Sequence, residues 1–144
     1  AHTDGALESM LRALSPLIQD QGRLWVVFGC GGDRDRTKRG RMAKVACRHA
    51  DRIIITSDNP RTEDPRAILK DIDAGVGEED RSRTTLCQDR RAAIELAIGG
   101  ATGGDVVVIA GKGHEGYQLI GTESRDFDDR EVASRALRRR GIQE

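Results

Sequence analysis

The sequence predicts an α/β fold: a Rossmann-like, mainly parallel sheet with helices on both faces and a β-hairpin at its C-terminal edge. Short apolar runs rich in β-branched residues alternate with helical patterns along the chain, and this alternation is typical of parallel sheets. The most apolar run, residues 106–110, has the composition of a central strand buried on both faces. The 144 residues fit a single domain, residues 1–144, with its own core.

The first half of the chain alternates helices and strands. Leucines at positions 7, 11 and 14 share one helical face, which predicts a helix that Pro16 ends. Asp4 is the expected N-cap of that helix. After it we expect, in order, strand 24–28, helix 39–49, strand 53–56 and helix 65–74. Asp64 and Pro65 indicate the start of the last helix, because aspartate caps helices and proline is favoured at their first position.

The second half continues this pattern and closes with a hairpin. After a polar connection, residues 75–83, we expect strand 84–87, helix 89–98 ended by Gly99 and Gly100, and strand 106–110. Residues 117–120 and 123–127 are the expected edge strands, joined at Gly121 and Thr122. A last helix begins at Asp128 or Asp129.

Composition and charge exclude several classes of function. Basic and acidic residues number 24 each, and 3% of residues are aromatic, so nucleic acid is not an expected partner. No apolar run reaches the length of a membrane span, and no secretory segment is evident at the start. The three cysteines, far apart and without a C-x-x-C pair, indicate no metal site and favour a reducing compartment. We expect a monomeric, cytoplasmic domain. We also expect it to be cut from a longer polypeptide, because the sequence starts with Ala1 and not with an initiator methionine.

The turn Asp58-Asn59-Pro60-Arg61 is the strongest functional signal. It follows the expected strand 53–56, and ligands of open α/β sheets bind at the carboxyl ends of strands. An amino-acid ligand needs such a set, because its ammonium pairs with a carboxylate and its carboxylate with a guanidinium fork. Taken alone, these four residues are better explained as an Asx-type turn with a surface arginine. Similar loops at two other strand ends favour a binding site instead.

The other two loops also follow apolar strands. Residues 29–36 are rich in glycine and charge, and the glycines would let backbone N–H groups approach an anion. Residues 111–116 match the spacing G-x-G-x-x-G, but a strand-like run follows where a dinucleotide fingerprint must open a helix. We therefore interpret Glu115 as a carboxylate offered to a cationic ligand group. Neither loop has P-loop spacing.

Together the three loops resemble a known family. Residues 29–35, 58–61 and 111–115, in this order, are similar to the C-terminal domain of the Mur ligases that add meso-diaminopimelate to UDP-N-acetylmuramoyl-L-alanyl-D-glutamate. The opening Ala1-His2-Thr3 resembles the end of the Asp-Tyr-Ala-His-Thr segment by which that family enters this domain. The resemblance spans essentially the whole chain.

The resemblance implies a substrate and its site. The distal amino-acid end of diaminopimelate would be held by Asp58, Asn59, Arg61, Gly111 and Glu115. Arg34 would hold the carboxylate beside the reacting amine, and His2 would lie near the nucleotide. No residue of this domain is implied to be catalytic. Arginine at position 61 is typical of the diaminopimelate type rather than of lysine-adding relatives, since its fork fits a carboxylate that lysine lacks.

The resemblance also implies partners that this chain lacks. ATP and Mg²⁺ would be bound mainly by a central domain and the UDP-substrate by an N-terminal domain, so the chain alone should not catalyse amide formation. Two alternatives stay open. A free-standing regulatory module that binds an amino acid could use the same loops. The folylpolyglutamate synthetase branch of the superfamily is disfavoured by the Asp-Asn-Pro-Arg turn.

Overall fold

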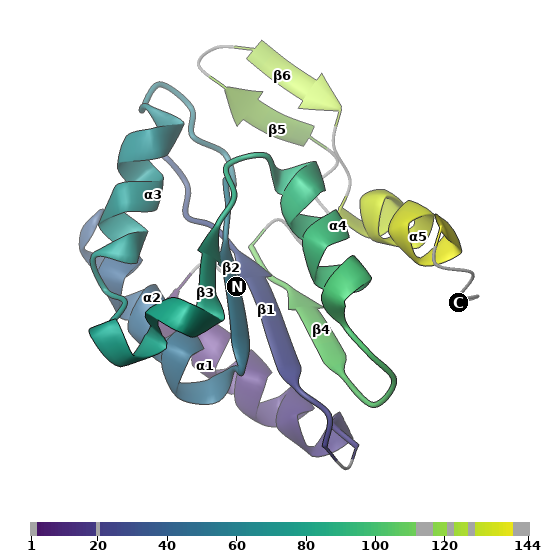
Figure 1. Cartoon of the computed structure of the whole chain (residues 1–144). Helices are drawn as coiled ribbons and strands as arrows, with labels where there is room; N and C mark the ends of the chain where they lie inside the picture. Colours follow the sequence, from purple (N-terminus) through teal and green to yellow (C-terminus); the bar gives the residue numbers. More distant parts are fainter. Residues whose placement is uncertain (1–2, 20, 112–116, 121–122, 127–128, 140–144) are drawn as a thin grey trace.

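A computed structural model of the chain describes residues 3–19, 21–111, 117–120, 123–126 and 129–139. Its main sheet has four parallel strands in the order β3-β2-β1-β4 (Figure 1). Their bounds are Leu24–Phe28 for β1, Arg52–Ile55 for β2, Thr84–Leu86 for β3 and Val106–Ile109 for β4. The register places Val26 of β1 between Ile53 of β2 and Val108 of β4. The predicted parallel α/β fold is confirmed.

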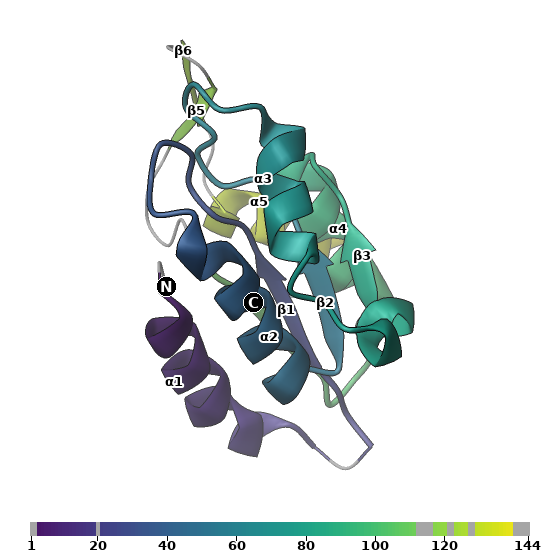
Figure 2. The same cartoon turned by 90° about the vertical axis from the view of Figure 1, so that its left-hand side faces the viewer.

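Helices cover both faces of this sheet (Figures 1 and 2). One face carries α1 (Asp4–Leu14), α2 (Thr37–His49) and α3 (Pro65–Asp73), and the other carries α4 (Arg90–Gly100) and α5 (Asp129–Arg139). Two short 3₁₀ helices are η1 (Ser15–Leu17) and η2 (Glu78–Arg83), the second within the expected polar connection. Connections between parallel strands are right-handed. The chain moves outward from β1 to β3 and then returns past β1 to β4, so the helices of these two parts of the chain lie on opposite faces of the sheet.

The strand β1 lies at the centre of the core, because its side chains alternate between two apolar clusters. Val26 and Phe28 pack on the side of α1, α2 and α3, and Val27 packs on the side of α4 and α5. A parallel strand buried on both faces needs a continuous apolar sequence, which is why this run showed no polar alternation. Trp25 of the same strand is half-buried, and its indole N–H donates to Asp105 at 3.0 Å.

The predicted C-terminal hairpin forms, but as a sheet of its own. The strands β5 (Tyr117–Ile120) and β6 (Glu123–Asp126) pair in antiparallel fashion and are separate from the four parallel strands. Among the described strands β4 pairs with β1 alone, so it lies at the edge of the main sheet and the expectation of a central strand at residues 106–110 is wrong. In Figure 1 the hairpin lies beyond the carboxyl edge of the main sheet instead of extending that sheet.

The ends of some helices differ from expectation. Thr3, rather than Asp4, caps α1, because its hydroxyl accepts a backbone N–H of the first turn at 3.0 Å. The helix α2 begins at Thr37, two residues earlier than predicted, where the Asp35 carboxylate accepts the Thr37 N–H at 2.9 Å. The helix α4 continues to Gly100. These differences are confined to single turns and leave the positions of the loops at the sheet edge as predicted.

Candidate functional site

The loops after β1, β2 and β4 start at the carboxyl edge of the sheet. The chain moves outward from β1 to β2 and β3 and then returns to the other side of β1, so the strand order reverses between β1 and β4. Open α/β sheets bind their ligands in the crevice at such a reversal. The three loops singled out by the sequence therefore lie where this class of fold binds small molecules.

Glycine is required in the first loop because this loop packs against the second. A Cβ on Gly29 would lie 2.3 Å from the carbonyl oxygen of Thr56, and one on Gly32 would lie 1.7 Å from that of Pro60. The Gly32 N–H donates to the Asn59 carbonyl at 2.7 Å. For Gly32 the expectation of an N–H facing an anion is therefore wrong. Its lack of a side chain serves close contact between two loops.

Asp58 and Asn59 lie at the buried end of the second loop. Their exposed fractions are 4% and 3%, so both side chains lie inside the protein. Gly111, two residues after the end of β4, adopts a φ of +114°, and a Cβ there would lie 3.4 Å from Oδ2 of Asp58. Glycine alone adopts this backbone conformation without strain. The structure thus brings Gly111 and Asp58 side by side.

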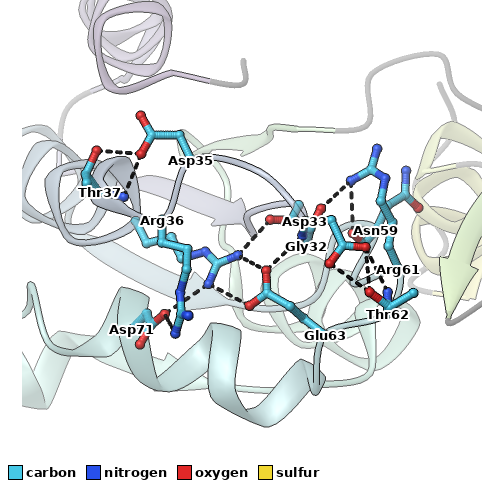
Figure 3. A network of polar contacts seen from close by, with 12 residues as sticks. Gly32, Asp33, Asp35, Arg36, Thr37, Asn59, Arg61, Thr62, Glu63 and Asp71 are labelled. Atoms are coloured by element: carbon cyan, nitrogen blue, oxygen red, sulfur yellow. Dashed lines mark hydrogen bonds and ion pairs between the residues drawn. The ribbon is translucent and has the colours of Figure 1, made fainter.

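Arg61 is held against the first loop in a left-handed conformation. Its φ of +53° costs a non-glycine residue roughly 1–2 kcal/mol. Nη1 donates to the carbonyl oxygens of Gly32 at 3.0 Å and Asn59 at 3.3 Å (Figure 3). Among the residues that the structure describes, none accepts a hydrogen bond from Nε or Nη2. One nitrogen therefore anchors the side chain, and the other edge of the fork can donate to a carboxylate.

Three of the four charged residues at positions 33–36 are engaged within the protein. Asp33 accepts a hydrogen bond from the Thr62 hydroxyl at 2.7 Å. Asp35 binds the first residue of α2, and Arg36 binds α3 through an ion pair of 3.3 Å. Arg34 is exposed and makes no hydrogen bond or ion pair with another described residue. Of the four, Arg34 is thus the residue available to a ligand.

Arg34 and Arg61 come from different loops and flank Gly31. A Cβ on Gly31 would lie 2.8 Å from Nη1 of Arg61 and 3.6 Å from Cγ of Arg34. Two cationic side chains therefore converge next to one glycine at the carboxyl edge of the sheet. Such a pair suits a ligand with two carboxylates, because each guanidinium can hold one of them.

Arg39, near the start of α2, is fully buried and joins the first two loops. Nη1 and Nη2 donate to the two oxygens of Glu63 at 3.0 and 2.7 Å. Nη1 also donates to Asp71 at 2.9 Å, and Nη2 to the Gly31 carbonyl at 3.0 Å. Oε1 of Glu63 accepts the Asp33 N–H at 2.8 Å. Hydrogen bonds from Arg39, above all, lower the pKa of Glu63 to about 2.

A second buried arginine, Arg90, lies on the other side of the second loop. Its guanidinium contacts Asp129 of α5 and the carbonyl oxygens of Ser57 and Ala110, which lie just beyond the ends of β2 and β4. Sequence analysis missed both Arg39 and Arg90 as parts of the site. Arginine in a helical pattern ordinarily faces solvent, and the sequence holds no local sign that these two do not.

Other chemistry is not indicated by the described residues. Within them, no group of three or more His, Cys, Asp or Glu side chains is arranged to hold a metal ion. Burial raises the pKa of the Cys30 thiol to about 12, so this thiol in the first loop stays protonated and is a poor nucleophile. No helix in the described part of the chain is long and apolar enough to cross a membrane.

Comparison with known proteins adds a family to this geometry. A family model described as "Mur ligase, glutamate ligase domain" matches residues 1–113. The chain belongs to the Mur ligase family. The matched range contains the first two loops of the site and reaches Gly111 at the start of the third.

Relatives of this Mur ligase domain share much of its sequence. Proteins of Prochlorococcus marinus and Synechococcus elongatus are 55% and 58% identical to it over 140 residues, and both are named UDP-N-acetylmuramoyl-L-alanyl-D-glutamate–2,6-diaminopimelate ligase. The alignments cover 97% of this chain and 27% of each relative. A solved structure with the same name is 44% identical, with a TM-score of 0.91 over 99% of this chain and 29% of its own. The chain therefore spans about a quarter of the length of these relatives.

A more distant solved structure shares the fold alone. It is a domain of a Haemophilus ducreyi protein, 12% identical, with a TM-score of 0.55 over 96% of this chain.

Two residues of the predicted site in the Mur ligase domain, Glu115 and His2, lie outside the described residues. Their roles stay predictions.

Proposed function

We propose that this Mur ligase domain binds meso-diaminopimelate and presents its amine to an ATP-dependent ligation on UDP-N-acetylmuramoyl-L-alanyl-D-glutamate. The arrangement of Arg61 carries the proposal. One nitrogen of its guanidinium donates to two carbonyl oxygens, and the other edge can donate to a carboxylate. Arg61 also lies three residues after Asp58, whose carboxylate is buried. Relatives that are more than half identical to this chain are named as diaminopimelate ligases, which supports this amino acid as the ligand.

The charges of the ligand match those of the site. Diaminopimelate carries two ammonium and two carboxylate groups. Arg61 would form a fork with the distal carboxylate, while Asp58, Asn59 and the Gly111 turn, together with Glu115, would hold the distal ammonium end. Arg34 would hold the carboxylate beside the reacting amine. Lysine lacks the distal carboxylate and would leave the Arg61 fork without its partner.

The reaction of the whole ligase would proceed through an acyl phosphate. ATP would phosphorylate the side-chain carboxylate of the D-glutamate, the amine of diaminopimelate would attack the acyl carbon, and phosphate would leave. This domain would position the amine, and holding reactants in place can lower a barrier by roughly 7–11 kcal/mol in favourable systems. Closure onto a central domain would bring amine and acyl phosphate together.

ATP and Mg²⁺ would be held mainly outside this domain, although His2 would lie near the nucleotide. The N–H groups of Gly32 and Asp33, which a phosphate in the glycine-rich loop would need, already donate to Asn59 and Glu63. This loop therefore does not fit a triphosphate. We place the domain, residues 1–144, after the nucleotide-binding and UDP-binding domains of a monomeric, cytoplasmic enzyme.

Substrate selection by the full-length ligase tests this proposal. The protein would be incubated with ATP, Mg²⁺, the UDP-substrate and either meso-diaminopimelate or L-lysine, and the amide product would be measured by mass spectrometry. We expect the kcat/KM for lysine to be roughly ten- to a hundredfold lower than that for meso-diaminopimelate, because lysine lacks one charged, hydrogen-bonded contact. Omitting ATP is the control and should abolish the product. Equal use of lysine, or no product with diaminopimelate, would overturn the proposed function.

A further inference from the structure

We infer that Arg90 is a positioning residue of the diaminopimelate site, and that its ion pair with Asp129 of α5 holds it against the backbone that leads into Asp58 and Gly111. This inference rests on the proposed function. Arg90 is not itself expected to touch the ligand. It would act through the backbone that holds Asp58 and Gly111.

Arg90 is buried at a place that disfavours a buried cation. It is the first residue of α4, and its exposed fraction is 1%, while that of Asp129 is 3%. The dipole of a helix presents its positive end at the N-terminus, and burial removes the hydration of a charged group. A cation remains stable there only when specific contacts compensate for both effects.

The guanidinium of this arginine donates through all three of its nitrogens. Nε and Nη2 donate to the two oxygens of Asp129, each at 2.7 Å, which is the bidentate geometry of a strong arginine–carboxylate pair. Nη1 donates to the Ser57 carbonyl at 2.8 Å, and Nη2 also donates to the Ala110 carbonyl at 3.1 Å. Ser57 and Ala110 immediately precede Asp58 and Gly111.

The ion pair with Asp129 holds this guanidinium in place. Without it, the buried cation would lack its strongest partner, and its contacts with the Ser57 and Ala110 carbonyls would lose their fixed orientation.

The same guanidinium also fixes the spacing between the loops after β2 and β4. A Cβ on Gly111 would lie 3.4 Å from Oδ2 of Asp58 and 3.8 Å from Nη2 of Arg90, so the three residues meet at one point. A shift of the backbone at Ser57 or Ala110 would change the distance between Asp58 and Gly111. Misplacing a binding group by about 1 Å can reduce a rate by two orders of magnitude.

Kinetics of the full-length ligase would test the role of Arg90. Arg90→Lys keeps the charge but loses the fork that spans a carboxylate and two carbonyls. We expect the KM for meso-diaminopimelate to rise about tenfold or more, with the KM for ATP within about twofold of wild type. Asp129→Asn keeps the shape but removes the charge, and it should raise the same KM. Amide hydrogen exchange at Ala110, whose N–H donates to the Val27 carbonyl at 2.8 Å, should become faster in both variants.

Arg83 offers a matched control at the opposite edge of the sheet. Its Nη1 and Nη2 donate to the carbonyl oxygens of Ala50 at 2.5 Å and Cys47 at 2.9 Å, and the side chain also pairs with Asp80. Arg83→Lys removes a comparable fork before β3, far from the loops of the site. It should lower the melting temperature and leave the KM for meso-diaminopimelate within about twofold of wild type.

The possible outcomes separate this inference from the proposed function. A wild-type ligase that does not use meso-diaminopimelate would overturn the proposed function. A wild-type ligase that uses it, together with a folded Arg90→Lys variant of unchanged KM, would overturn the inference alone. Equal rises in the KM values for diaminopimelate and ATP would also overturn it, by indicating a general effect on folding. If Arg90→Lys does not fold, an unchanged KM in Asp129→Asn would decide against the inference.

Discussion

Arg39 and Glu63 share two hydrogen bonds inside the protein, from Nη2 to Oε1 at 2.7 Å and from Nη1 to Oε2 at 3.0 Å. The pair connects α2 to the loop after β2. Since Oε1 of Glu63 also accepts the Asp33 N–H, the pair fixes the loop that presents Arg34 beside the loop that presents Arg61. The relative position of Arg34 and Arg61 thus depends on a contact of the buried Arg39 that neither of them makes.

The stability conferred by Glu63 should depend on pH. The folded-state pKa of this carboxyl is lowered from 4.5 to about 2, chiefly by hydrogen bonds from Arg39. The ionised form therefore stabilises the fold above about pH 4.5, and this contribution is lost as the pH falls toward 2. Glu63→Gln lacks the charge at every pH, and its free energy of unfolding at neutral pH should be lower by about 1.5–3 kcal/mol.

Urea unfolding of the 144-residue chain between about pH 7 and pH 3 would measure this difference. The gap between wild type and Glu63→Gln should narrow through the acid part of that range. Glu131→Gln, which removes one partner of an exposed ion pair with Arg135, is the control and should change the stability by less than about 0.5–1 kcal/mol. A gap that is the same at all pH values would show that the Glu63 charge contributes nothing.

Arg61→Lys should weaken diaminopimelate selectively in the full-length ligase. Lysine keeps the charge but lacks the planar group that contacts two backbone carbonyls and a ligand carboxylate at once. The free energy of binding diaminopimelate should therefore weaken by about 1.5–3 kcal/mol. Steady-state kinetics should show a higher KM for diaminopimelate and an unchanged KM for ATP. If both values rise together, Arg61 serves the fold rather than the ligand.

Gly111→Ala should damage both stability and ligand binding. The φ of +114° is strained for alanine, and the new Cβ would lie 3.4 Å from Oδ2 of Asp58, so a loss of about 1–3 kcal/mol in stability is expected. Gly99→Ala is the matched control, because nothing lies within 4 Å of a Cβ at this exposed helical position. It should stabilise the domain by up to about 1 kcal/mol. Thermal melts would compare the two, and a neutral Gly111→Ala would contradict the tight turn.

Glu115→Gln should lower activity through the amino-acid substrate. The substitution keeps the size of the side chain but removes the charge that we assign to the distal ammonium. Activity with meso-diaminopimelate should fall strongly, while the melting temperature stays near wild type. A solvated loop glutamate would instead change stability by no more than about 0.5 kcal/mol and leave kinetics intact. Unchanged kinetics would remove Glu115 from the site.

Strands and loops of this domain could be predicted because their signals are local. A parallel strand buried on both faces needs a continuous apolar run, as in β1. Asp64 precedes Pro65 at the start of α3 and accepts a hydrogen bond from the backbone of its first turn, as expected of an N-cap. Strand order then brings the loop residues to one edge, since parallel strands all end on the same side of the sheet.

The buried arginines could not be predicted, because their partners are distant in sequence. Arg39 binds Glu63 and Asp71, and Arg90 binds Asp129, thirty-nine residues further along. Each side chain lies in a helical pattern where a charge ordinarily faces water. The role of the glycines was equally hidden, since close contact between two loops leaves no trace in the sequence of either one.

A crystal structure of the full-length ligase with meso-diaminopimelate would test the central claim most directly. We predict one carboxylate of the ligand within hydrogen-bond distance of the Arg61 guanidinium, with the neighbouring ammonium beside Asp58 and the second carboxylate near Arg34. A ligand bound away from the carboxyl edge of this sheet, or one whose carboxylates contact neither Arg61 nor Arg34, would contradict the account.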